Sequence, residues 1–198
     1  MLTNWGYTAK LGQGVEKLPA FMTVAEFKVA TGGVMSSTDN QISWALDAVS
    51  QAIRDWCGWH VSPVIDCTYT GDGEGRFLQL PVMGLQAVSK LTIAGNVLAQ
   101  TAYQWTREGL IKLNGGVFPS SWRSVDVEFS SGYPCAGALG AVLVQIASNA
   151  LAAAPGVASE RAGNVQITYN QTANGVSGGV ALLDRDRLLL APYRICEV

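Results

Sequence analysis

Residues 37–59 constrain the fold most strongly, because they form the clearest amphipathic helix in the sequence. Apolar side chains recur there at three- and four-residue steps, so they share one side of a helix with 3.6 residues per turn. These core-helix positions are Ile42, Leu46, Val49, Ile53 and Trp56. Thr38 and Gln41 have the spacing of a capping box, and Gly58 suits the left-handed position after the last turn. One face of this helix must therefore be buried.

The composition supports a folded, soluble chain with a sizeable core. The 198 residues are 48% hydrophobic, which allows one substantial core, or one core with a smaller module beside it. Charged residues make up only 14% and the formal net charge is -2, so no basic surface is expected to attract nucleic acid or a membrane. The N-terminus lacks the charged start and apolar run of a signal peptide, which predicts synthesis in the cytoplasm.

Two further helices are predicted. Thr23 and Glu26 form a second capping box, and the short helix that follows should pack against the long one as a helical hairpin over residues 23–62. Residues 136–154 form a third, charge-free helix within a segment 134–162 that ends in a linker. A membrane span is one interpretation of this helix, but its polar cluster and its missing charged flanks favour burial between layers or subunits.

The region 63–133 has the pattern of short antiparallel strands. Residues 67–70 and 76–80 are expected to form a hairpin around a glycine-rich turn, and residues 103–106 and 110–113 a second hairpin. Residues 88–93 continue through a turn to residues 97–98, and residues 125–129 alternate between apolar and charged. The predicted fold class is α+β, a small helical bundle with an inserted antiparallel β module and a C-terminal strand-loop-helix segment.

The two ends of the chain are predicted to differ. Residues 1–22 show neither the 3.6-residue period of a helix nor the 2-residue period of a strand. They are expected to form an N-terminal arm with Trp5 and Tyr7 as aromatic anchors. Such an arm either orders on a neighbouring molecule or packs on its own domain. Residues 163–198 are expected to give a strand, a flexible loop over 171–179 and a short helix that ends before Pro192.

No catalytic, cofactor or metal site is predicted. His60 is the only histidine, and one histidine at a helix exit is more often a packing or capping residue than a general base. Cys57, Cys67, Cys135 and Cys196 lack the spacing of a zinc or redox site and are expected to be buried apolar residues. The glycine-rich turns match neither a GxGxxG motif nor a P-loop, and the segment at Asp72 lacks the ligand series of an EF-hand. The chain is therefore not expected to be an enzyme.

The order of segments over roughly residues 23–194 resembles the head-tail connector, or adaptor, proteins of long-tailed bacteriophages. The resemblance is carried by the successive stretches IRDWCGWHVSP, TYTGDGEGRFLQLP, VSKLTIAGNVL, YQWTREGLIKLNGGVFPSSW and VDVEFSSGYP, followed by a helix. Late in the chain, SERAGNVQITYNQ and LLDRDRLLLAPYR resemble the closing strand and C-terminal segment of that family. The extended arm and the charge-free third helix depart from its usual pattern.

The resemblance implies a virion protein of the phage neck, made in the host cytoplasm. Such proteins form a homo-oligomeric ring, usually of twelve copies, that docks beneath the portal, joins the capsid to stopper or tail proteins, and continues the DNA channel. Double-stranded DNA would pass through without sequence-specific binding, and no membrane is involved. The candidate portal contacts that follow are Leu188, Leu189, Leu190, Pro192, Tyr193 and Arg194. The candidate subunit contacts are Trp5, Tyr7, Leu139, Val142, Gln145 and Asn149.

The sequence is also compatible with two alternative functions. The first is a neck stopper or tail-completion protein, one layer further from the portal. The second is a small ligand-binding or enzyme domain whose pocket is built from tryptophans, because aromatic side chains often line pockets. Its residues would be Trp44, Trp56, Trp59, Trp105 and Trp122. Scattered tryptophans, however, more often fill cores and interfaces.

Overall fold

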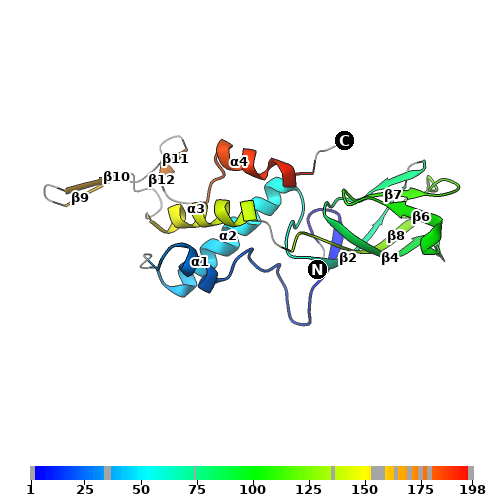
Figure 1. Ribbon diagram of the computed structural model, residues 1–198, viewed down its shortest axis with the longest axis horizontal. Coiled ribbons are helices and arrows are strands. Elements are labelled where there is room, and N and C mark those ends of the chain that lie inside the picture. The colour runs from blue at the N-terminus through cyan, green and yellow to red at the C-terminus, as the bar shows by residue number, and fades with distance from the viewer. Residues whose placement is uncertain are drawn as a thin grey trace. The chain divides into compact units, whose positions relative to one another are not determined.

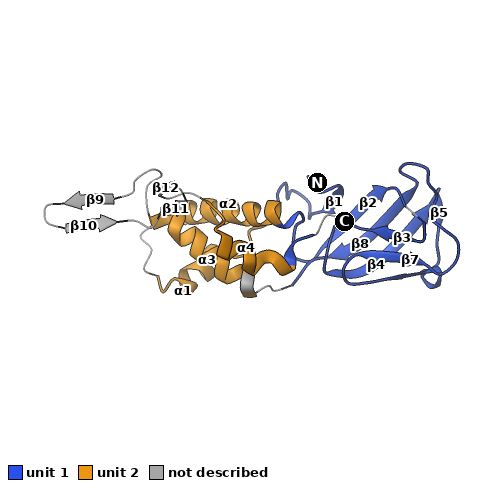
Figure 2. Cartoon of the chain, turned by 90° about the horizontal axis from the view of Figure 1, so that it is seen from above, with its two compact units in different colours: residues 1–18, 57–135, 193–198 blue, residues 19–56, 136–192 orange. Residues whose placement is uncertain are grey.

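The chain forms two compact units, which are coloured separately in Figure 2. Unit 1 comprises Met1–Leu18, Cys57–Cys135 and Tyr193–Val198, and unit 2 comprises Pro19–Trp56 and Ala136–Pro192. The computed structural model describes residues 3–33, 37–73, 75–134, 137–152, 159–162, 165–168, 171–173, 176–177 and 180–195. Helices and antiparallel strands are segregated along the chain, which confirms the predicted α+β class.

Unit 2 is built around the long amphipathic helix (Figure 1). The helices are α1 (Val24–Ala30), α2 (Asp39–Cys57), α3 (Gly137–Ala152) and α4 (Asp184–Leu190), and the 3-10 turn η2 (Ala191–Tyr193) follows α4. Ile42, Leu46, Val49 and Ile53 of α2 are buried, while Trp56 is half-buried. The 3.6-residue apolar period thus corresponds to the buried face of this helix.

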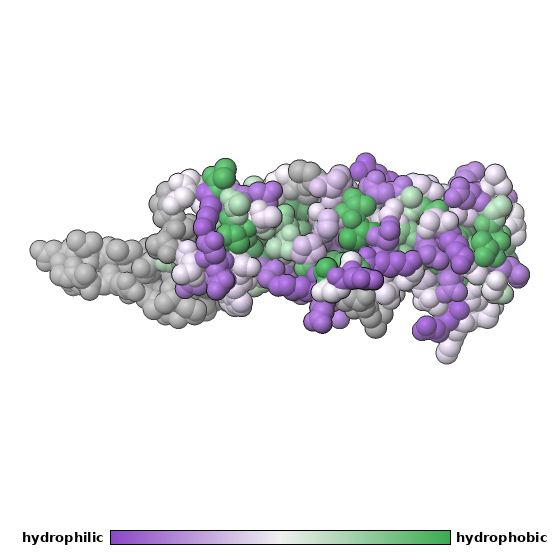
Figure 3. All heavy atoms as spheres, turned by 90° about the horizontal axis from the view of Figure 1, so that it is seen from below, coloured by the Kyte–Doolittle hydropathy of each residue, from purple (hydrophilic) through white to green (hydrophobic). Residues whose placement is uncertain are grey.

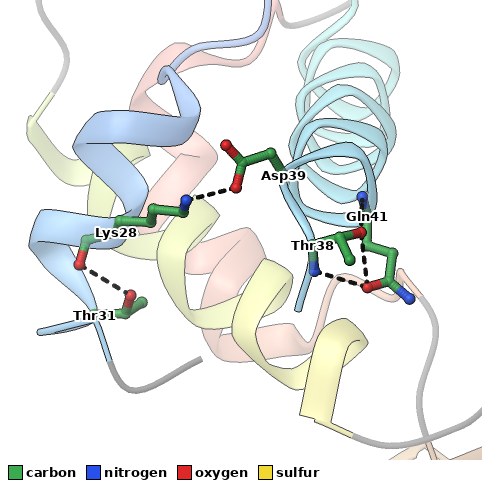
Figure 4. Close-up of polar contacts among 5 residues, drawn as sticks. All are labelled: Lys28, Thr31, Thr38, Asp39 and Gln41. Atoms are coloured by element: carbon green, nitrogen blue, oxygen red, sulfur yellow. Dashed lines mark hydrogen bonds and ion pairs between the residues drawn. The ribbon is translucent and has the colours of Figure 1, made fainter. Parts of the chain in front are cut away.

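Both predicted capping boxes are confirmed. The Thr23 amide donates to the Glu26 carboxylate, the Glu26 amide donates to Thr23 Oγ1, and the same exchange joins Thr38 and Gln41. The hydrogen bond from the Thr23 backbone is the main cause that lowers the pKa of the Glu26 carboxyl. Figure 4 shows Lys28 of α1 reaching Asp39 at the start of α2, so an ion pair also connects the hairpin. Local signals determine where these two helices begin.

Unit 1 is built from two antiparallel sheets. The five-stranded sheet has the order β1 (Tyr7–Lys10), β2 (Ile65–Gly71), β8 (Val125–Ser131), β4 (Leu85–Ile93) and β5 (Asn96–Val97). The three-stranded sheet has the order β3 (Phe77–Gln79), β7 (Leu110–Leu113) and β6 (Tyr103–Trp105), with the 3-10 turn η1 (Gln100–Ala102) before β6. The predicted β6–β7 hairpin and the turn from β4 into β5 are confirmed. Val125, Val127 and Phe129 of β8 are buried, as its period-2 pattern predicts.

The predicted hairpin between residues 67–70 and 76–80 is wrong. β2 pairs with β1 and β8, whereas β3 pairs with β7 in the other sheet. The glycine-rich segment carries the chain from one sheet to the other, and a Cβ on Gly73 would lie only 2.2 Å from the Cβ of Phe118. A glycine is therefore required at position 73 because the loop that contains Phe118 approaches its backbone closely, and not because of a hairpin turn.

The N-terminal segment supplies an edge strand. β1 pairs with β2 in the register Tyr7 to Tyr69 and Ala9 to Cys67, and Tyr7 and Ala9 are buried. Trp5 is half-buried, with its ring centroid 6.2 Å from that of Tyr7. Part of the segment predicted as an arm is therefore integrated in the sheet of its own unit.

Unit 2 also contains two short hairpins that precede α4. β9 (Ser159–Ala162) pairs with β10 (Val165–Thr168), and β11 (Gln171–Ala173) pairs with β12 (Val176–Ser177). β10 corresponds to the strand predicted at the start of the segment 163–198, while β9, β11 and β12 were not predicted. Residues 153–158, 174–175 and 178–179, which belong to the predicted linker and loop, lie outside the described residues.

Candidate interaction surfaces

Large apolar side chains reach the surface at several separate places. Figure 3 shows hydrophobic groups, in green, divided by purple hydrophilic residues on the face in view. Among the described residues of unit 2, the exposed large apolar side chains are Val29, Trp44, Leu188 and Leu189. In unit 1 they include Phe77, Val117, Trp105 and Trp122. Clustered rather than single exposed apolar residues mark candidate contacts with other molecules.

The C-terminal helix α4 presents two of these residues together. Leu190 is fully buried and anchors the helix, which corrects its prediction as a portal contact, while the preceding Leu188 and Leu189 are 75% and 55% exposed. Asp186 is buried, accepts a 3.0 Å hydrogen bond from the Leu183 amide at the helix start, and pairs with Arg185. The buried Asp186 carboxylate thus stabilises the start of α4. The exposed side of the same helix carries the adjacent Leu188 and Leu189.

The remaining predicted portal contacts belong to different environments. Pro192 and Arg194 are exposed, while Tyr193 is half-buried, with its ring edge-on to Tyr133 at 5.4 Å. The Tyr193 carbonyl accepts a 2.6 Å hydrogen bond from Trp59 Nε1. Leu188 to Pro192 belong to unit 2, whereas Tyr193 and Arg194 belong to unit 1. The set is contiguous in sequence but does not form one surface of a single unit.

Three of the predicted subunit contacts are buried in the chain itself. Tyr7, Leu139 and Val142 are each no more than 2% exposed, which corrects the expectation that they face a neighbour. Gln145 is exposed, and Asn149, like Trp5, is half-buried. Leu139 and Val142 lie on the apolar side of α3, and this side is buried within unit 2.

The loop between β7 and β8 carries the most exposed tryptophan. Trp122 is 87% exposed, while Phe118 in the same loop is buried. Asp72 accepts a hydrogen bond from the backbone amide of Arg123, and Arg123 adopts a positive φ of 53°. Phe118 also donates its amide to the Gly75 carbonyl at 2.7 Å. The tryptophan is therefore displayed on a loop that the preceding β2–β3 segment holds in place.

A hollow of about 450 Å³ lies beside the edge strand β6 of the same unit. Its lining comes from β4, η1 and β6, and consists of Ala87, Val88, Gln100, Tyr103, Gln104 and Trp105. Trp105 is 39% exposed, Gln100 and Gln104 are exposed, and burial raises the pKa of the Tyr103 hydroxyl. Neither this hollow nor the Trp122 loop was predicted, since only folding brings their residues together.

Arg54 is an unexpected buried cation on α2. It is 1% exposed, its guanidinium carbon lies 4.5 Å from the centroid of the Phe21 ring, and Nη2 donates a 2.6 Å hydrogen bond to the Pro19 carbonyl. A planar guanidinium can stack on an aromatic ring while it donates hydrogen bonds at its edge. The sequence places Arg54 on the polar side of α2 and contains no signal for this role.

The groups considered for chemistry have structural roles. His60 is fully buried between the Tyr7 hydroxyl and the Ser131 carbonyl, at 2.7 and 2.9 Å. Cys57 and Cys67 are free and buried, and burial raises the pKa of each thiol to about 12. Cys135 and Cys196 lie outside the described residues. Within the described ranges, no group of His, Cys, Asp and Glu side chains has an arrangement suited to a metal ion.

The five tryptophans of the pocket alternative do not gather at one site. Trp44 and Trp56 belong to unit 2, and Trp59, Trp105 and Trp122 belong to unit 1. Trp59 is fully buried, while Trp122 is almost fully exposed. Of these tryptophans, only Trp105 lines the hollow described above.

None of the helices in the described part of the chain combines the length and apolar character that crossing a membrane requires. The charge-free helix α3 spans Gly137–Ala152.

The fold is similar to that of chains in solved particle structures. One belongs to the neck of a native gene transfer agent particle computed with C12 symmetry, with a TM-score of 0.61 and 14% identity over 97% of this chain and 96% of that chain. The neck of an empty particle computed with C6 symmetry gives a TM-score of 0.58 at 15% identity, and the virion of the native particle gives 0.59 at 16% identity, with the same coverage. No protein-family model and no curated protein matches the chain. At these identities the likeness establishes the fold.

Proposed function

We propose that this chain is a structural protein of a phage-like neck, an adaptor that forms a ring beneath the portal and continues the DNA channel toward the tail. The observation that carries this proposal is the fold shared, over nearly the whole chain, with chains from gene transfer agent necks. The C12 symmetry of one of those necks supports a ring of twelve copies here. The low charge content agrees with a channel through which DNA passes without tight phosphate binding.

The exposed pair Leu188 and Leu189 is the proposed portal contact of this ring. The buried Leu190 and the hydrogen bond at the start of α4 hold the helix in place. Leu188 and Leu189 are therefore free to contact another molecule without being removed from the core of unit 2. Burial of two exposed leucines at an interface removes a large apolar area from water. Such adjacent apolar anchors, rather than the polar residues around them, usually carry most of the affinity of an interface.

The test is sedimentation velocity of the chain mixed with the portal ring of its own phage, with each component also run alone. The expected result is co-sedimentation at a fixed number of copies per portal. Replacing both leucines, Leu188→Ser with Leu189→Ser, should weaken docking by about 30-fold or more, the usual effect of losing an interface hot spot. Val29→Ser is the matched control, because Val29 is 82% exposed on α1 of the same unit.

Two results would count against the proposal. If the portal sediments unchanged in the presence of the chain, direct docking is excluded, and binding to a preassembled adaptor ring would instead support the stopper alternative. If docking is retained by the double serine variant but lost by Val29→Ser, the portal contact lies elsewhere on unit 2.

A further inference from the structure

We infer that Trp122 of one copy inserts into the hollow beside β6 of a neighbouring copy, and that this contact joins adjacent subunits of the ring. The inference rests on the proposed ring function and names the contact that closes it. Its occupant is a second copy of this chain, because the exposed side chain and the hollow that suits it are both on unit 1.

Trp122 is presented in a way that favours binding. The indole is 87% exposed, yet its neighbours are ordered by the buried Phe118 and by the hydrogen bond between Asp72 and the Arg123 amide. Arg123 maintains a positive φ, which is unfavourable for a residue with a side chain and marks a constrained loop. A rigid loop loses little conformational freedom when its tryptophan is buried by a partner.

The hollow has the size and chemistry for an indole. Its volume of about 450 Å³ is within the range of about 300–1,000 Å³ typical of binding pockets. Among the described residues, its lining contains no charged side chain, and it offers the ring of Trp105 together with the amides of Gln100 and Gln104. Aromatic rings prefer offset or edge-to-face contact with one another. The indole Nε1 is a donor only, and each glutamine side chain carries an acceptor oxygen.

The two features lie toward opposite edges of the three-stranded sheet. The Trp122 loop is held by Asp72 and by Gly75, which precede edge strand β3, whereas the hollow is lined by the other edge strand, β6. The exposure of Trp122 shows that it does not fill the hollow of its own copy. Contact between two different surfaces of identical subunits repeats head to tail, and such heterologous contacts close into rings when the rotation permits.

The first experiment maps the contact directly. A photoreactive benzoylphenylalanine replaces Trp122 in the full chain, which is assembled on its portal ring, irradiated and digested for mass spectrometry. The expected cross-link joins position 122 to residues 87–88 or 100–105 of another copy, and isotope-labelled subunits distinguish it from a link within one copy. An assembled ring in which position 122 links only to other regions overturns the inference while the proposed function stands.

The second experiment measures assembly energetics by sedimentation velocity over a concentration series. Trp122→Ala and Trp105→Ala should each raise the concentration needed for assembly by about 10- to 30-fold, and the double variant by less than the product of the two, because the residues are coupled. Trp44→Ala is the matched control, an exposed tryptophan of unit 2. If the effects of Trp122→Ala and Trp105→Ala on the assembly concentration simply multiply in the double variant, the two residues are not coupled and the inferred contact is overturned. If the wild-type chain forms no oligomer even with the portal, both the contact and the proposed ring are overturned.

Discussion

At the residue scale, the buried trio Tyr7, His60 and Ser131 explains how the N-terminal strand is attached. The Ser131 carbonyl can only accept, so His60 Nε2 carries its hydrogen toward it, and Nδ1 accepts from the Tyr7 hydroxyl at 2.7 Å. The Tyr7 oxygen also accepts a 3.1 Å hydrogen bond from the His60 amide. The Tyr7 hydroxyl, both ring nitrogens of His60 and the Ser131 carbonyl are thus hydrogen-bonded, although all three residues are buried. Loss of one partner therefore leaves a buried group without its hydrogen bond.

This arrangement predicts the effect of Tyr7→Phe. The substitution keeps the ring but leaves His60 Nδ1 without its donor, so the free energy of unfolding should fall by about 1–3 kcal/mol. Urea denaturation followed by tryptophan fluorescence measures it. Tyr193→Phe is the control, because the half-buried Tyr193 accepts from Trp59 through its carbonyl rather than its hydroxyl. Equal stability of Tyr7→Phe and the wild-type chain would show that the hydrogen bond contributes nothing net.

At the element scale, α2 combines an apolar face with one buried cation. The stacking of Arg54 on Phe21 and its hydrogen bond to the Pro19 carbonyl connect α2 to the segment that precedes α1. Ser50 adds a second connection, since its hydroxyl accepts from the Phe21 amide at 3.1 Å and donates to the Leu46 carbonyl. Arg54 and Ser50 therefore fasten the backbone of this irregular segment to α2, at the Pro19 carbonyl and the Phe21 amide.

Arg54→Ala tests this role. A desolvated cation–π contact is worth about 2 kcal/mol and a hydrogen bond from a charged donor about 1.5–3 kcal/mol, so a loss of about 3 kcal/mol in unfolding free energy is expected. Arg54→Lys should recover only part of it, because an ammonium lacks the planar geometry of the guanidinium. Gln51→Ala, on the exposed side of the same helix, is the control in the same urea experiment. A loss below about 0.5 kcal/mol for Arg54→Ala, the range of ordinary surface substitutions, would contradict this account.

At the scale of the whole molecule, unit 1 is completed by both ends of the chain. Its central segment Cys57–Cys135 provides most strands, Met1–Leu18 contributes edge strand β1, and Tyr193–Val198 returns to it. Ile195 donates its amide to the Cys57 carbonyl at 3.0 Å, which attaches the C-terminal segment. Because β1 occupies the edge of β2, it also protects a strand that would otherwise offer unpaired backbone groups.

Removal of residues 1–10 should therefore affect more than an appendage. We expect a lower thermal midpoint and concentration-dependent association through the uncovered edge of β2, measured by calorimetry and size-exclusion chromatography. The control is removal of residues 1–2 alone, which retains β1 and the bond from the Thr3 hydroxyl to the Tyr7 carbonyl. If the longer truncation is as stable and as monodisperse as the control, β1 is dispensable to the sheet.

The sequence by itself determined the elements whose signals are local. The capping boxes at Thr23 and Thr38, the apolar stripe of α2, the β6–β7 hairpin and the alternation in β8 all depend on residues a few positions apart. Their physical causes, amide capping, 3.6-residue and 2-residue periodicity and turn chemistry, operate before any long-range contact forms.

Only the tertiary structure decided which distant segments meet. The pairing of Tyr7 with Tyr69, the separation of β2 and β3 into different sheets, and the burial of Arg54 depend on partners far away in sequence, or on a surface that forms only when the chain folds. The same holds for the exposure of Trp122 and for the hollow beside β6, because both arise where loops and strands from separate parts of the chain pack together. Strand partners and surfaces are selected by packing and hydrogen-bond satisfaction across the whole unit, which no short stretch of sequence encodes.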